Sequence, residues 1–266
     1  MATGNSSTAE TRRVLPVARA LCWIGFGLGV STVAMLGAAE MDTGPAVFAR
    51  RAEQAFEQAR DRFQANTNDV TAAWKLGQAA LAWADFAKNN AQREEIARAG
   101  MAACRRALTL APDSAAAHFY LGTNLGQLAR ARKLEALSLI KEIERQFEAA
   151  RVLDEQFNQA GPDRCLGLLY LDAPGWPASL GSRHKAREHL ERAVALSPGF
   201  PENRLSLMEA YVRWKDSRQL RLQAEAYEKG LNETRQRFTG EAWEFDWQDW
   251  NTRWNRLLDQ LRRLRK

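Results

Sequence analysis

Cysteine and histidine are scarce in this sequence of 266 residues, which has three of each. Three cysteines are too few for the disulfide framework that stabilises small secreted domains. Cys104 and Cys165 occupy helix positions expected to be buried, where a free thiol behaves as a small apolar side chain. The histidines are not spaced with cysteines or carboxylates in a pattern that holds a metal ion. We therefore expect neither a disulfide framework nor a metal centre.

Recognisable catalytic motifs are also missing. The sequence has no glycine-rich phosphate loop, no nucleophile in a familiar setting and no paired-histidine motif. Carboxylate pairs such as Glu94-Glu95 are typical of solvated helix surface. We therefore expect a protein that is not an enzyme and that needs no cofactor.

The net charge is a modest +6, and part of the excess of basic residues lies near the chain ends. No long basic face with interleaved aromatic residues is present, so we do not expect nucleic acid as a partner. Apolar residues make up 45% of the chain and charged residues 26%, as in ordinary soluble proteins. Only 8 prolines interrupt a chain rich in Ala, Leu, Glu, Arg and Gln, which indicates an all-α fold.

Residues 1–39 have the pattern of an export signal. Arg12, Arg13 and Arg19 precede an uncharged run from Ala20 to Ala39 that ends in small residues. The run is about 20 residues, which also suffices to cross a bilayer as a helix. We expect the protein to be exported, and either cleaved after Ala39 or kept as a membrane anchor. Residues 40–45 are expected to form a linker.

The rest of the chain has the spacing of a helical repeat. A tetratricopeptide (TPR) unit carries a Leu-Gly pair on its first helix and ends its second helix near a proline about 25 residues later. The pairs here are Leu76-Gly77, Leu121-Gly122 and Leu166-Gly167, with Leu207-Met208 as a degenerate fourth. Nine residues separate Pro112 from Leu121, and nine separate Pro198 from Leu207. The units therefore join in the normal register.

Four helical hairpins follow from this spacing. The expected pairs are 71–86 with 94–110, 114–130 with 133–158, 162–171 with 183–197, and 201–215 with 219–231. The distances from Leu76 to Pro112 and from Leu166 to Pro198 exceed that of the plain repeat, so extra residues lie between the two helices of a unit. Insertions in a repeat fold collect on one face, which is often the binding face.

Further helices are expected at both ends of the repeats. Residues 46–65 have helical apolar spacing. Residues 241–266 place tryptophans and leucines on one wide apolar stripe, which fits either a cap on the stack or an interface with a partner, a membrane or a second copy. We thus expect an all-α, TPR-like α-solenoid of about four hairpins, with a repeat domain at 46–240 and a capping helix at 241–266.

The loop from Asp172 to Gly181 is the first candidate binding site. Two prolines and two glycines keep it out of a helix, and Trp176 lies in its middle. The tryptophan either packs onto the stack or contacts a ligand. Tyr170 and Asp172 lead into the loop and are included as candidate binding residues.

Amide side chains form the second candidate site. Asn124 and Gln127 lie on the first helix of the second unit, and such helices line the concave groove of a TPR stack. They offer hydrogen bonds either to a ligand in the groove or to neighbouring helices. Asn203 and Arg204, at the start of the fourth unit, are expected close to the same groove.

Three stretches, FYLGTNLGQLAR, GPDRCLGLLYLDAPGWP and KAREHLERAVALSPGFPENRL, give a family resemblance. Between Thr71 and Leu231 the chain resembles the T components of TRAP transporters, with a weaker likeness to mitochondrial regulators of microtubule dynamics. The first resemblance implies a periplasmic protein that associates with the solute-binding component of an uptake system, and oligomers with a central pore. The chain departs from that family because the cysteine that carries its lipid anchor has no counterpart here.

We expect an interaction protein of the cell envelope, in the periplasm or anchored to the membrane that faces it. The favoured hypothesis is an accessory component of TRAP-type solute uptake that docks a periplasmic solute-binding protein. The alternatives are a general TPR scaffold that binds peptide segments in envelope assembly, and a binder of small hydrophobic ligands beside Trp176. The sequence leaves self-association open.

Overall fold

The computed structural model describes residues 44–175 and 177–264, and in this part of the chain it is a stack of α-helices without β-strands. The signal or anchor expected at 1–39 and the tryptophan at 176 lie outside the described residues. The helices are α1 (Pro45–Ala65), α2 (Val70–Ala84), α3 (Asn90–Leu110), α4 (Ala115–Ala131), α5 (Ala136–Leu153), α6 (Phe157–Asp172), α7 (Arg183–Leu196), α8 (Pro201–Arg213), α9 (Ser217–Arg237) and α10 (Glu244–Arg263).

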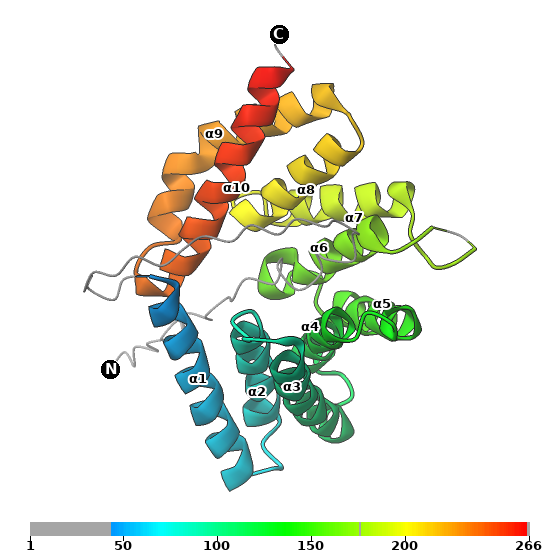
Figure 1. Cartoon of the computed structure of the whole chain (residues 1–266), viewed down its shortest axis with the longest axis vertical. Coiled ribbons are helices and arrows are strands. Elements are labelled where there is room, and N and C mark those ends of the chain that lie inside the picture. The colour runs from blue at the N-terminus through cyan, green and yellow to red at the C-terminus, as the bar shows by residue number, and fades with distance from the viewer. Residues whose placement is uncertain (1–43, 176, 265–266) are drawn as a thin grey trace, which may run out of the picture.

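Four hairpins follow one another along the stack: α2–α3, α4–α5, α6–α7 and α8–α9. Helix α1 packs on α2 at one end, and α10 packs on α8 and α9 at the other. The stack curves so that the start of α1 lies beside the start of α10 (Figure 1). The expected TPR-like α-solenoid, with four hairpins and an additional helix at each end, is confirmed.

The Leu-Gly pairs bring the two helices of a unit together. A Cβ added to Gly77 would lie 2.2 Å from Cys104 Sγ, and one added to Gly122 would lie 2.7 Å from the Phe147 ring. A Cβ on Gly167 would lie 2.6 Å from Leu190. Gly77, Gly122 and Gly167 therefore each receive a side chain from the partner helix of their own unit, which is the packing that the repeat spacing predicts.

Helix boundaries differ from the expected ones where a local cap decides them. Helix α3 begins at Asn90 rather than at Glu94, because the Asn89 side chain accepts a hydrogen bond from Gln92 N at 2.9 Å. Helix α5 ends at Leu153, earlier than the expected residue 158.

A left-handed turn separates α5 from the right-handed part of α6. Asn158, Gln159 and Ala160 have φ of 52°, 59° and 58°. Three consecutive residues with a side chain in this region are strained, at a cost of roughly 1–2 kcal/mol each. The turn directs the chain from the second unit into the third, and hydrogen bonds from α6 and α8 hold it there.

The tryptophan stripe of α10 packs on the last hairpin. Trp250, Trp254 and Leu257 are buried, and Trp250 is in edge contact with Phe200 at 5.6 Å between ring centroids. This packing makes α10 a cap on the fourth unit. Among the described helices none is both long and apolar enough to span a membrane.

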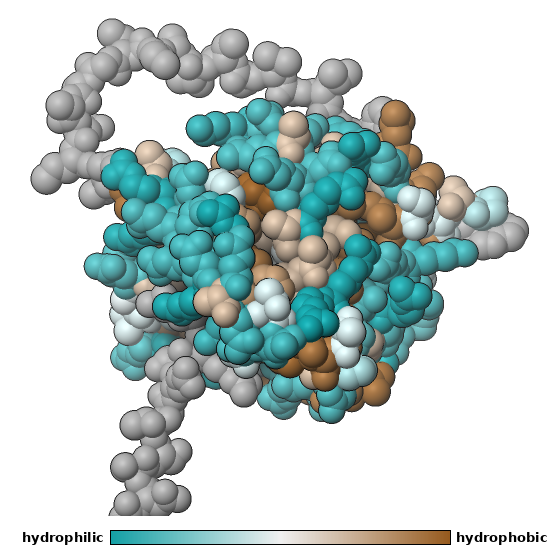
Figure 2. All heavy atoms as spheres, turned by 90° about the horizontal axis from the view of Figure 1, so that it is seen from below, coloured by the Kyte–Doolittle hydropathy of each residue, from teal (hydrophilic) through white to brown (hydrophobic). Residues whose placement is uncertain are grey.

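The outer surface is mostly polar. Figure 2 shows one face on which hydrophilic side chains separate smaller apolar areas. Leu134, at the turn between α4 and α5, is fully exposed, and Val152 is 76% exposed. Single exposed apolar side chains of this kind are normal for a folded protein.

Candidate functional site

The amides expected to line the groove lie in the core. Asn124 is completely buried, and its Nδ2 donates to Gly77 O at 2.8 Å and to Tyr120 O at 2.7 Å. Gln127 is also buried, and its Nε2 donates to Asp85 Oδ1 at 2.9 Å. The amides of Asn124 and Gln127 are thus used in hydrogen bonds within the helical stack, and not in an open groove. Neither side chain offers exposed surface to a partner in this conformation.

Asn203 holds the left-handed turn in place. Its Nδ2 donates to Gln159 O at 3.0 Å and to Ala193 O at 2.9 Å, and its Oδ1 accepts from Arg164 Nη1 at 2.6 Å. The side chain is fully buried. This amide therefore joins α8 to the turn, to α7 and to α6 rather than facing an open groove.

Arg204 is a partly buried neighbour of α9. Its guanidinium donates to Gln223 Oε1 and, at 3.5 Å, to Pro198 O. Burial lowers the pKa of Arg204 below its ordinary value. The structure thus separates Asn203 and Arg204 from the loop that carries the remaining candidates.

The α6–α7 loop, of which the structure describes residues 173–175 and 177–182, projects from the edge of the stack (Figure 1). Gly181 N donates to Pro174 O at 2.9 Å, and Ser182 N donates to Tyr170 O at 3.0 Å. A Cβ on Gly181 would lie 2.1 Å from Ala173 O, so only glycine fits there without a shift of the backbone. These contacts fix the shape of the loop on the side that joins the stack.

Tyr170 lines a pocket of about 340 Å³ beneath this loop, and Asp172 follows it at the end of α6. The other residues of the pocket come from the end of α6, the loop, the start of α7 and the end of α8: Leu171, Ala173, Gly175, Gly181, Ser182, Arg183, Arg213 and Trp214. The Tyr170 hydroxyl donates to Glu144 Oε1 at 2.5 Å. Two of the candidate residues are therefore brought together at the loop, and Trp176 lies outside the described residues.

Asp172 and Arg213 form an ion pair at the edge of this pocket. Burial raises the pKa of Asp172, against the opposing effect of the Arg213 charge. Arg213 Nη2 also donates to Leu171 O at 3.1 Å. The pair ties the end of α8 to the end of α6, below the loop.

Cations and aromatic rings alternate around the pocket. The guanidinium of Arg183 lies 5.5 Å from the centre of the Trp214 ring, and that of Arg187 lies 5.3 Å from the same ring. The ammonium of Lys185 lies 4.8 Å from the centre of the Tyr170 ring. Contacts of this geometry are favourable cation–π interactions.

A buried ionic cluster joins α8 to α10, and the sequence analysis did not anticipate it. Glu202 is fully buried, and its carboxylate accepts from Arg253 Nη1 at 2.6 Å and from Trp250 Nε1 at 3.0 Å. Arg253 also binds Glu209 through two hydrogen bonds of 2.8 Å. The sequence feature that could have predicted this cluster is the spacing of Trp250 and Arg253, which lie one helical turn apart on an otherwise apolar stripe.

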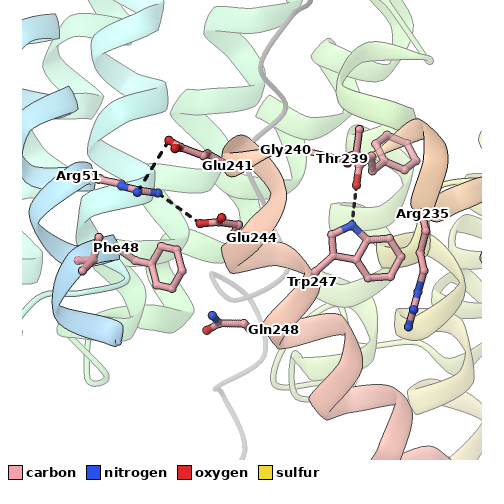
Figure 3. A pocket seen from close by; sticks show the side chains of 11 residues that line it. Phe48, Arg51, Arg235, Thr239, Gly240, Glu241, Glu244, Trp247 and Gln248 are labelled. Carbon is pink, nitrogen blue, oxygen red and sulfur yellow. Dashed lines mark hydrogen bonds and ion pairs between the residues drawn. The ribbon is translucent and has the colours of Figure 1, made fainter. Parts of the chain in front are cut away.

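A second depression lies where the two ends of the stack meet. A cleft of about 780 Å³ separates α1 from the start of α10 and is lined by apolar, aromatic and charged residues, among them Phe48, Arg51, Phe238, Glu244 and Trp247 (Figure 3). Arg51 reaches across it toward Glu241 at 3.8 Å and Glu244 at 3.5 Å. Trp247 Nε1 donates to Phe238 O at 2.6 Å.

The described residues offer neither a metal site nor a reactive thiol. Within 44–175 and 177–264, no cluster of three or more His, Cys, Asp or Glu side chains could hold a metal ion. The thiols of Cys104 and Cys165 are buried, and burial raises the pKa of Cys165 to about 12. These two thiols are therefore poor nucleophiles in the folded protein.

Comparisons with known proteins give similarity at the level of solved structures. No family model matches the chain, and no curated protein sequence matches it. The chain is similar to the crystal structure of MamA, with 20% identity over 73% of this chain and 95% of that one, and a TM-score of 0.43. It is also similar to yeast Tom70, with 10% identity over 92% of this chain and 70% of that one, and a TM-score of 0.32.

Proposed function

We propose that this chain is a non-enzymatic scaffold that binds a protein partner at the edge of the stack formed by the α6–α7 loop. The observation that carries the proposal is the projecting α6–α7 loop, whose described residues form backbone hydrogen bonds at its base and have a pocket with Tyr170, Arg183 and Trp214 beneath them. Loops held on a rigid scaffold are common binding elements.

The packing of the stack supports this location. Asn124 of α4 and Asn203 of α8 were candidates for binding a ligand in the groove, but both donate hydrogen bonds to backbone carbonyls of neighbouring helices. The α6–α7 loop presents exposed Pro174, Pro177 and Ala178. Prolines reduce the conformational freedom that a loop loses on binding, which favours a preformed contact surface.

The finer proposal concerns the partner and the compartment. The resemblance between residues 71–231 and the T components of TRAP transporters supports a solute-binding protein of an uptake system as the partner. The cationic start and uncharged run of residues 1–39 support export to the periplasm. In this proposal the chain holds the solute-binding protein near the membrane, and binding rather than chemistry is its contribution.

Site-specific photo-crosslinking tests the contact. A benzophenone side chain replaces Ala178 in the loop or, as the control, Leu134 in the α4–α5 turn of the preceding hairpin, and the full chain is expressed in its native envelope. Both positions are exposed. We expect a solute-binding protein to be crosslinked from position 178 and not from position 134, as identified by mass spectrometry.

Two results would count against the proposal. Equal crosslinking from both positions would mean that the loop is not the contact surface. Recovery of an envelope-assembly protein in place of a solute-binding protein would favour the general scaffold, and crosslinks within pairs of this chain alone would indicate self-association.

A small hydrophobic ligand is the second candidate function, and the cleft between α1 and α10 favours it. The volume of about 780 Å³ and the rings of Phe48, Phe238 and Trp247 suit a ligand of drug-like size. We would follow the melting temperature of the full chain with a panel of hydrophobic ligands, and compare Phe48→Ala with the exposed-site variant Leu222→Ala. A ligand that raises the melting temperature of both variants equally does not use this cleft.

A further inference from the structure

Four cations from two helices gather beside the pocket under the α6–α7 loop. Arg183, Lys185 and Arg187 come from α7, and Arg213 comes from the end of α8. Arg183, Lys185 and Arg213 are exposed, and Arg187 is half-buried. We name these four residues the α7 cationic face.

The carboxylates near this face neutralise only half of it. Asp172 pairs with Arg213, and Asp216 pairs with Arg187 at 2.9 Å. In the part of the chain that the structure describes, Arg183 and Lys185 have no carboxylate within ion-pair distance and rest on the rings of Trp214 and Tyr170. Among the described side chains, Arg183 and Lys185 therefore have no direct ion-pair partner, and Asp216 acts on Arg183 only at longer range.

These charges oppose the stability of the helix that carries them. The first turn of α7 contains Arg183, His184 and Lys185 and no acidic residue, and its last turn contains no basic residue. The positive end of the helix dipole lies at the first turn, so cations there are unfavourable and anions favourable. The cation–π contacts of Arg183 and Lys185 offset part of this cost. A local arrangement that still lowers helix stability is expected where a surface is used for binding.

An aromatic surface lies between the charges. Trp214 is half-buried, contacts Tyr211 at 5.8 Å between ring centroids, and lines the 340 Å³ pocket together with Arg183 and Arg213. The pocket is large enough for one apolar side chain, and the cations surround it. Charge and shape at this place thus complement a peptide that carries carboxylates on both sides of an apolar residue.

We infer that the α7 cationic face binds an acidic segment of a partner protein, with carboxylates on Arg183 and Lys185 and an apolar side chain against Trp214. This inference rests on the proposed function, because it gives the chemistry of the partner at the same loop. The positive end of the α7 dipole adds to the attraction.

A binding assay with a defined probe tests the inference. The probe is a short fluorescein-labelled peptide with glutamates on both sides of one leucine, and its anisotropy is measured with the full chain at about 0.15 M salt. Arg183→Glu/Lys185→Glu is compared with Arg62→Glu/Lys229→Glu, which changes the net charge equally at exposed positions on α1 and α9. Thermal melts establish that both variants are folded.

We expect the reversal on α7 to weaken peptide binding by at least about tenfold and the control reversal to change it by less than about twofold. Trp214→Ala should also weaken binding, since the apolar contact is lost. The same peptide with glutamine in place of glutamate should bind weakly. Equal losses in the two reversals would overturn the inference, because the long-range charge of the chain would then explain binding.

Other anionic partners give distinct outcomes. Phosphatidylglycerol vesicles or single-stranded oligothymidine that bind as tightly as the peptide, with the same loss on reversal, would show a general anion surface and contradict a peptide site.

The reversal is also tested in the crosslinking experiment at position 178. Undiminished crosslinking to a partner would refute the acidic segment but retain the scaffold, whereas wild-type chain without any partner would refute the scaffold itself.

Discussion

The ring of Phe48 lies 5.2 Å from the ring of Phe245, centroid to centroid, which joins the first described helix to the last. Phe86, which follows the end of α2, also contacts Phe245, with 5.0 Å between the two ring centroids. The ion pairs of Arg51 beside it are largely exposed. Because exposed ion pairs contribute little, the aromatic contacts stabilise this junction more than the Arg51 pairs do.

Phe245→Ala should loosen this contact. The loss of two aromatic pairs and of part of the buried ring area predicts a decrease of about 1–3 kcal/mol in the free energy of unfolding. Spin labels at Gln54 and Gln248 should then report a longer and broader distance distribution. Leu222→Ala, at an exposed site on α9, serves as the control. An unchanged distribution in Phe245→Ala would mean that other contacts hold the ends.

Gly100→Ala and Gly230→Ala should have opposite effects on stability. A Cβ on Gly100 would lie 2.7 Å from Ala80 Cβ and 2.5 Å from Asn124 Oδ1, so α3 would have to move away from α2 and α4. Overpacking of this kind costs about 1–3 kcal/mol. Gly230, on α9, has open space around the added atom, and alanine there should stabilise by about 0.5–1 kcal/mol. Urea unfolding measures both.

Arg253→Met should be strongly destabilising, because it leaves the Glu202 carboxylate buried without its ionic partner. Removing one member of a buried pair typically costs about 3–5 kcal/mol. Arg262→Met, which breaks the exposed pair with Asp259, should cost less than about 1 kcal/mol. The double variant Arg253→Met/Glu202→Gln should recover part of the loss. Additive effects in this cycle would show that the pair is not coupled.

The same carboxylate gives an expected pH dependence. Burial by itself would raise the pKa of Glu202, but the charges of Arg253 and Arg164 lower the pKa below its ordinary value. A depressed folded-state pKa stabilises the protein fully above the unfolded-state pKa, about 4.3, and this contribution is lost as the pH falls through the folded-state pKa. The free energy of unfolding of Glu202→Gln should therefore decline less steeply below that pH. If the free energy of unfolding fell equally steeply with pH in the wild type and in Glu202→Gln, the acid sensitivity would come from other carboxylates.

Lys215→Gly should stabilise the turn between α8 and α9. Lys215 has φ of 56°, in the left-handed region that disfavours a side chain by about 1–2 kcal/mol. Glycine removes that strain but increases the freedom of the unfolded chain, so the net gain should be roughly 0.5–1 kcal/mol. Lys229→Gly, in the interior of α9, should instead destabilise by about 1 kcal/mol. A shift of the urea midpoint in the same direction for both would contradict this.

Much of the architecture could be predicted because its signals are local. The Leu-Gly pairs at 76–77, 121–122 and 166–167 specify where two helices approach closely, and the structure shows a partner side chain over each glycine. The same reasoning located the α6–α7 loop, since prolines and glycines exclude a helix there.

The roles of polar residues were harder to predict. The residues around Asn124 look the same in the sequence whether its side chain faces a groove or a neighbouring helix. Only the position of α2 shows that the Asn124 amide donates a hydrogen bond to Gly77 O. The left-handed turn at 158–160 contains no glycine, and Asn158 is its one residue of a type that favours this region. The turn persists because Asn203, which is distant in sequence, and Arg164, which is five residues away, both donate to Gln159 O.

The sequence by itself determined the helical repeat, its register, the loop between α6 and α7 and the amphipathic character of the last helix, since each depends on spacing and turn chemistry within one segment. The tertiary structure decided which side chains became core and which became surface, where α10 packs, and that Arg183, Arg187 and Arg213 meet around Trp214. Those relations join residues that are far apart along the chain. They depend on the curvature of the whole stack, which accumulates from many small packing angles and which no single segment encodes.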